Sequence, residues 1–119
     1  MATETVTGWC SRGHGALHPV LAAERQLSAA LHLNHVVMLA AADQLFAATD
    51  AACAWLAANP CPDSELEVHM ARILNNCAEV ARTAQRLATD PLTSTESAWR
   101  RMDNLAAVIR IDAQALEEW

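Results

Sequence analysis

Apolar residues recur at helical spacing along most of the chain. They follow alternating steps of three and four residues, which is the spacing of one face of a helix packed against others. Three such seams can be traced: Leu31, His35, Met38, Ala42, Leu45, Thr49, Ala52 and Leu56; then Leu66, Met70, Ile73, Cys77, Val80, Ala84 and Leu87; and last Trp99, Met102, Ala106, Ile109, Ala113 and Leu116. The pattern predicts an all-α fold, an antiparallel bundle of three or four helices.

The first predicted helix is unusually long. It opens at Pro19, since proline suits a first helical turn, and no helix breaker follows before Asn59. Such a helix would have about 40 residues and span about 60 Å. A break near Asn34 is the alternative and would give four helices. We favour the long helix because nothing in residues 32–35 forces a turn.

Two capping boxes mark the later helices. Ser64 with Glu67 opens the second helix, and Thr93 with Glu96 opens the third. The second helix is expected to end before Pro91. Each of the two has roughly 25 residues, or about 38 Å, so the first helix would extend about 20 Å beyond them.

An overhanging apolar helix predicts an external partner. The expected overhang, residues 19–33, carries several leucines, and residues 36–39 are apolar on nearly every side of the helix. We therefore expect self-association, most simply as a two-fold homodimer. The predicted interface residues are Leu21, Leu27, Leu31, Val36, Leu39 and Trp55.

Composition supports one helical domain. The 119 residues suit a single compact unit, and no glycine follows Gly15, although β-turns normally need glycine. There is also no tyrosine. We expect residues 1–16 to form a polar, glycine-containing tail and residues 17–119 to form a single helical-bundle domain.

Charge and apolar runs exclude some partners. The formal net charge of −6 does not suit nucleic-acid binding, which needs a basic face. The longest strictly apolar run, Val36–Ala42, is short of the roughly 20 residues that span a bilayer. The N-terminus lacks the pattern of a signal peptide. We therefore expect a cytoplasmic protein without a nucleic-acid or membrane partner, with leaderless export as the alternative.

The four cysteines are expected to be reduced in that compartment. Cys53 and Cys61 are close enough in sequence that their redox state stays open.

Three histidines and one glutamate suggest metal binding as the alternative function. His32 and His35 lie three residues apart, and His69 follows Glu65 by four residues on the next predicted helix. Imidazoles and carboxylates on facing helices hold metals such as zinc or iron in bundles. The simpler interpretation makes His35 a partly buried core residue and places His32 and His69 on the surface.

Three short stretches resemble known families. Glu24-Arg25 followed by Leu31-His32 is similar to the segment before the phosphoacceptor of dimeric histidine-kinase hairpins, which implies phosphotransfer or dimerisation. Those families place a charged residue directly after the histidine, where this chain has Leu33.

Trp55-Leu56-Ala57 resembles the turn motif of small secreted helical hairpins of the WXG type, with alanine in place of the glycine. Residues 21–25 are similar to the first helix of small helical mutases, whose sites use a lysine that this chain lacks. No catalytic triad, glycine loop or paired-carboxylate motif is found. The sequence thus favours a non-catalytic interaction or assembly protein, with a metal- or small-ligand-binding bundle as the alternative.

Overall fold

The computed structural model describes residues 5–31 and 33–118. Four helices account for most of these residues: α1 (Val6–Ala30), α2 (His35–Ala58), α3 (Ser64–Thr89) and α4 (Thr95–Glu117). No strand occurs within these two ranges. The all-helical prediction is therefore confirmed, with four helices packed against one another.

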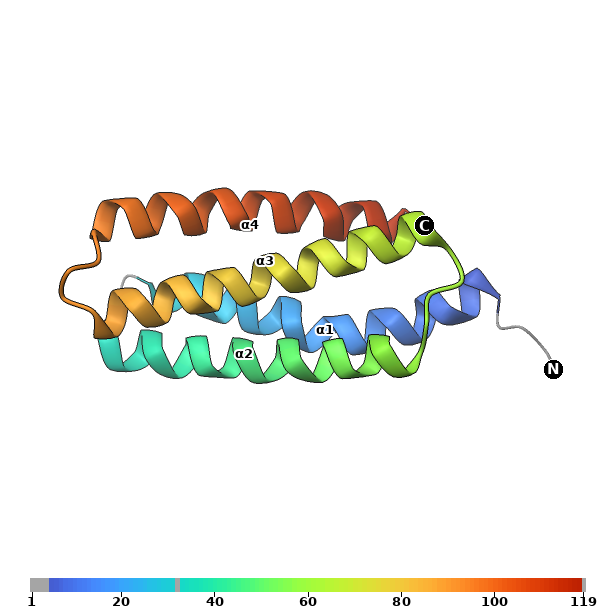
Figure 1. Ribbon diagram of the computed structural model, residues 1–119, viewed down its shortest axis with the longest axis horizontal. Helices are drawn as coiled ribbons and strands as arrows, with labels where there is room; N and C mark the ends of the chain where they lie inside the picture. Colours follow the sequence, from blue (N-terminus) through green and yellow to red (C-terminus); the bar gives the residue numbers. More distant parts are fainter. Residues whose placement is uncertain (1–4, 32, 119) are drawn as a thin grey trace.

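The helices lie side by side along the long axis of the molecule, which measures 54 × 21 × 19 Å (Figure 1). The α1–α2 and α3–α4 connections lie at one end, and the α2–α3 connection lies at the other (Figure 1). The main helix–helix contacts are between helices that are consecutive in the chain: α1 packs on α2, α2 on α3 and α3 on α4. Among the described residues, no Cα atom of α1 lies within 8 Å of one in α4.

The prediction of one helix from Pro19 to Asn59 is wrong. Helix α1 ends at Ala30 and α2 begins at His35. Asn34 is the N-cap of α2: its backbone is extended, and its side-chain oxygen accepts a hydrogen bond from the Val37 amide at 2.9 Å. Asparagine is among the preferred N-cap residues, so it begins a new helix without proline or glycine.

The expected polar tail over residues 1–16 also differs from the structure. Helix α1 begins at Val6 and contains Pro19 in its interior. Trp9 is almost completely buried, and its Nε1 donates a hydrogen bond to the carbonyl of Asn59 at 2.9 Å. Its ring lies 5.4 Å from that of Trp55, so the first turns of α1 are held against the end of α2.

The core is built from the predicted seams. All seven residues of the second seam, from Leu66 to Leu87, are buried on α3. Helix α3 begins at Ser64 as predicted, but the caps are one residue away from the predicted boxes: Asp63 caps α3 by accepting from the amides of Glu65 and Leu66, each at 3.0 Å, and Ser94 caps α4. The α4 seam is buried at Met102, Ile109 and Leu116 but exposed at its first residue, Trp99.

Candidate interaction surface

Large apolar side chains are exposed at the end of the molecule that carries the α1–α2 and α3–α4 connections (Figure 1). Val36, in the first turn of α2, is 79 % exposed, and Leu92, between α3 and α4, is 92 % exposed. We define the apolar end surface as Leu33, Val36, Val37, Leu92 and Trp99. Five of the eight exposed large apolar side chains of the described residues belong to it, so these side chains are concentrated at this end.

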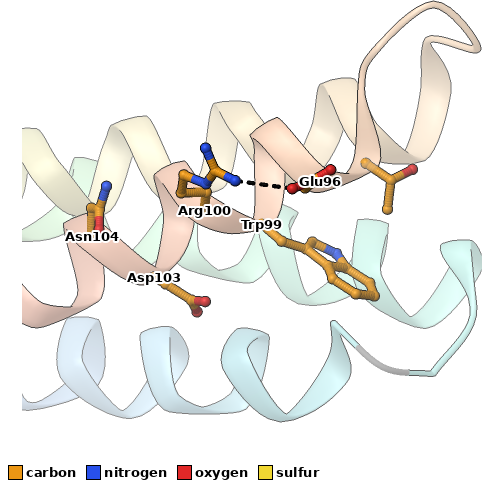
Figure 2. Close-up of a pocket in the computed structure, with 6 residues that line it drawn as sticks. Glu96, Trp99, Arg100, Asp103 and Asn104 are labelled. Carbon is orange, nitrogen blue, oxygen red and sulfur yellow. Dashed lines mark hydrogen bonds and ion pairs between the residues drawn. The ribbon is translucent and has the colours of Figure 1, made fainter.

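A groove connects parts of this surface. It has a volume of about 250 Å³ and is lined by Leu31, Leu33, Asn34, His35, Met38, Leu87, Thr95 and Trp99. Figure 2 shows the Trp99 indole projecting from α4 toward the α1–α2 connection. Glu96 and Arg100, by contrast, form an ion pair of 2.9 Å on another side of α4 (Figure 2). The tryptophan thus brings the start of α4 into the same surface as the start of α2.

The end surface is free of formal charge on its α1–α2 side. No aspartate, glutamate or arginine occurs between Arg25 and Asp43. The remaining length of α2 is largely apolar, and its exposed positions include Ala40, Ala47 and Ala54 beside the polar Asp43, Gln44 and Asp50. The helix therefore has a sparser polar outer face than a helix at the surface of a water-soluble domain normally presents.

By length and composition alone, α2 meets the criterion for a membrane-spanning helix, with a mean hydropathy of 1.4 over an 18-residue window. Only 28 % of that window is buried by the chain itself. Core helices of water-soluble proteins meet the same criterion. The observation therefore shows that α2 is an apolar helix that its own chain covers only in part, and it does not show whether lipid, water or another protein covers the rest.

The structure does not bring the predicted interface residues together on one surface. Leu27 is completely buried in its own core, and Leu21 is partly buried on α1 facing α4, so neither lies on an overhang. Val36 belongs to the apolar end surface and Leu31 lines the groove beside it, whereas Leu39 is partly buried along α2. Trp55 lies at the opposite end of α2 against Trp9 and beneath the Arg12 guanidinium.

The predicted metal ligands are not assembled into one site. His32 lies outside the described residues. His35 is the exposed first residue of α2, whereas His69 and Glu65 line a hollow with Ala115 and Glu118 near the other end of the molecule. Within residues 5–31 and 33–118, no group of three or more histidine, cysteine, aspartate or glutamate side chains is arranged to hold a metal ion.

His69 instead contributes to an ionic network that the sequence analysis missed. Its Nδ1 lies 2.8 Å from Oδ1 of Asp112, which is completely buried on α4. Arg72, one turn further along α3, donates to both carboxylate oxygens of Asp112 through Nε and Nη2. Burial raises the pKa of Asp112, but the hydrogen bonds from Arg72 and His69 outweigh it, and the pKa lies below its usual range. The arrangement joins α3 to α4.

A second network lies on the surface. Glu79 accepts hydrogen bonds from Arg101 of α4 and from Arg82 of its own helix. The Arg101 hydrogen bond is the largest of the effects that hold the pKa of Glu79 below its usual range. All three arginines near this carboxylate, Arg82, Arg86 and Arg101, are more than half exposed, so the network contributes little to stability.

The four cysteines are free. Cys53 is exposed on α2 and Cys77 is buried on α3, whereas Cys61 donates to the carbonyl of Asp63 at 3.1 Å. Burial, together with the charge of Glu24, raises the pKa of Cys77 to about 12, so its thiol stays protonated. A thiol in this environment is not a nucleophile.

Comparison with protein-family models, curated proteins and solved structures finds no match to this chain.

Proposed function

We propose that this chain is a non-catalytic assembly protein that self-associates through the apolar end surface. In this proposal the four helices form an antiparallel up-and-down bundle, and the end that carries the α1–α2 connection meets the same end of a second copy. The observation that supports it is the concentration of exposed Leu33, Val36, Val37, Leu92 and Trp99 at that end. The helix overhang predicted from the sequence plays no part, since α1 ends at Ala30.

Charge favours this end as the place where two copies meet. Each chain carries a formal net charge of −6, so two copies repel each other over most of their surfaces. The segment between Arg25 and Asp43 contains no formally charged residue, so this repulsion is weakest there. Burying a valine or leucine side chain contributes roughly 1.5–3 kcal/mol, so a few such side chains support an isologous contact.

Sedimentation velocity at micromolar concentration tests the proposal. The wild-type chain is expected to sediment at twice its 12.9 kDa mass. A double variant, Val36→Asp with Leu92→Asp, is expected to sediment as a monomer because each dimer would bury four new carboxylates. Both positions are solvent-exposed in the single chain, so the helical circular dichroism spectrum should not change.

The matched control is Val68→Asp. Val68 is 51 % exposed near the start of α3, at the opposite end from the apolar end surface. This variant should remain dimeric. A wild-type chain that stays monomeric at these concentrations, or a Val68→Asp variant that dissociates as completely as the double variant, would contradict the proposal.

A further inference from the structure

Helices α1 and α4 enclose a groove that is separate from the apolar end surface. Their backbones do not approach within 8 Å in the described part of the chain, although each packs on its own neighbours. The space between them has a volume of about 350 Å³, at the lower end of the range for small-molecule sites. Its lining is Leu21, Glu24, Arg25, Ile109, Arg110, Ala113, Gln114 and Glu117.

The most unusual residue of this groove is Glu24. It is only 7 % exposed, and its one hydrogen bond is to Oε1, which accepts from Ser28 Oγ at 3.0 Å. No arginine or histidine of the described residues lies within ion-pair distance of it. Burying a carboxylate without a cation is unfavourable, and proteins usually pair or ligate such a group.

The neighbours of Glu24 do not supply a cation. Cys77 is close enough for the Glu24 charge to contribute to its raised pKa, but a protonated thiol is neutral. Arg25 and Arg110 also line the groove, and both are solvent-exposed. Neither forms an ion pair with a described carboxylate.

The groove therefore combines three chemical zones. Glu24 places a negative charge at a buried position, whereas Arg25 and Arg110 place two positive charges and Glu117 one negative charge at exposed positions. Leu21 and Ile109 supply apolar lining to the same groove, and Ile109 is almost completely buried. A ligand that complements this lining carries a cation at its inner end, an apolar body, and an anion at its outer end.

We propose that the α1–α4 groove binds a small linear zwitterion, with a primary ammonium group on Glu24 and a carboxylate on Arg25 and Arg110. An ammonium group donates up to three hydrogen bonds and pairs with the carboxylate that the fold leaves without a cation. An aliphatic chain between the two charged ends contacts Leu21, Ile109 and Ala113. The inference does not depend on self-association, because the groove residues lie outside the apolar end surface.

Calorimetric titration with three probes of one chain length tests this inference. The probes are 8-aminooctanoate, octylamine and octanoate, which carry both charges, only the cation and only the anion. The expected order of affinity is 8-aminooctanoate, then octylamine, then octanoate. Amide chemical-shift changes should lie in residues 21–28 of α1 and 109–117 of α4.

Two variants assign the charged ends. Glu24→Gln keeps the shape of the side chain and should lower the affinity for 8-aminooctanoate and for octylamine alike, by about tenfold or more. Arg110→Gln should lower the affinity for 8-aminooctanoate but leave the affinity for octylamine unchanged, because octylamine carries no anionic group. Glu67→Gln, which removes an exposed carboxylate on α3, serves as the matched control and should bind all three probes as the wild type does.

Arg110 is exposed, so its variant tests the inference even if Glu24→Gln fails to fold. The inference is overturned by an absence of binding at millimolar probe, by octanoate binding as tightly as 8-aminooctanoate, or by chemical-shift changes located away from α1 and α4. An Arg110→Gln variant with unchanged affinity for 8-aminooctanoate would remove the assignment of the anionic end.

Discussion

The Nδ1 atom of His69 lies 2.8 Å from Oδ1 of Asp112, which ties the first turns of α3 to the last turns of α4. Arg72 makes a bidentate contact with the same carboxylate. Asp112 is completely buried, so its charge is retained in the fold only because these two partners surround it. Breaking this network should therefore destabilise the protein more than changing any surface carboxylate.

We predict that Asp112→Asn lowers the free energy of unfolding at neutral pH by about 2–3 kcal/mol. This is less than the cost of breaking a fully buried ion pair, because solvent screens the half-exposed Arg72. The folded-state pKa of Asp112 lies below its value in the unfolded chain, about 3.9. The contribution of the ionised Asp112 to the free energy of unfolding is therefore fully present above that value and is lost as the pH falls through the folded-state pKa. The difference between variant and wild type should shrink below about pH 4.

Urea unfolding followed by circular dichroism measures this difference across the pH range. Asp103→Asn is the control, because Asp103 is exposed on the same helix (Figure 2). It should change the unfolding free energy by less than about 0.5 kcal/mol. A pH-independent deficit for Asp112→Asn would show that packing, and not ionisation, is responsible for its effect.

Trp9 should stabilise the whole fold, although it lies nine residues from the start of the sequence. Trp9→Ala removes a nearly buried ring and should lower the free energy of unfolding by about 3–5 kcal/mol. Trp9→Phe keeps an aromatic contact with Trp55 and loses the hydrogen bond to Asn59, which should lower it less. Thermal unfolding of both variants distinguishes a packed first turn of α1 from an unpacked tail, for which neither substitution would matter.

The cysteines should differ sharply in reactivity. At mildly alkaline pH, Cys53 is expected to react first with iodoacetamide, because it is the exposed thiol of the described chain. Cys77 should react only after denaturation, since its thiol is buried and its pKa is raised to about 12. Peptide mass mapping at successive times measures the order. Rapid labelling of Cys77 in the folded protein would contradict the packing of α3 described above.

Helix type and core seams could be read from the sequence because they depend on local spacing. The α3 seam, from Leu66 to Leu87, is buried as its three- and four-residue steps predict. The break at Asn34 does not follow from the sequence, because asparagine is compatible with a helix interior and its N-cap role depends on how the next helix packs. Similarly, a tryptophan at position 9 is unusual for a free tail, but no local spacing identifies its partner Asn59, which is 50 residues away.

The polar sites were missed for the same reason. His69 and Asp112 are 43 residues apart, and no spacing rule relates two residues on different helices. Glu24 lies between Ala23 and Arg25 at a position that faces α4, but its burial follows only from the packing of the helices. One sequence signal was available for the apolar end surface: the absence of formal charge between Arg25 and Asp43.

The order in which the helices contact one another has a consequence for how the chain folds. Most backbone contacts join helices that are consecutive in the sequence and linked by short connections. Each helix can therefore dock on its predecessor with little loss of loop entropy, and helical folds with such local contacts fold within microseconds to milliseconds. Since α4 has backbone contacts only with α3 among the described helices, opening that one interface, which the Asp112 network with Arg72 and His69 reinforces, would expose the interior without unfolding the other three helices.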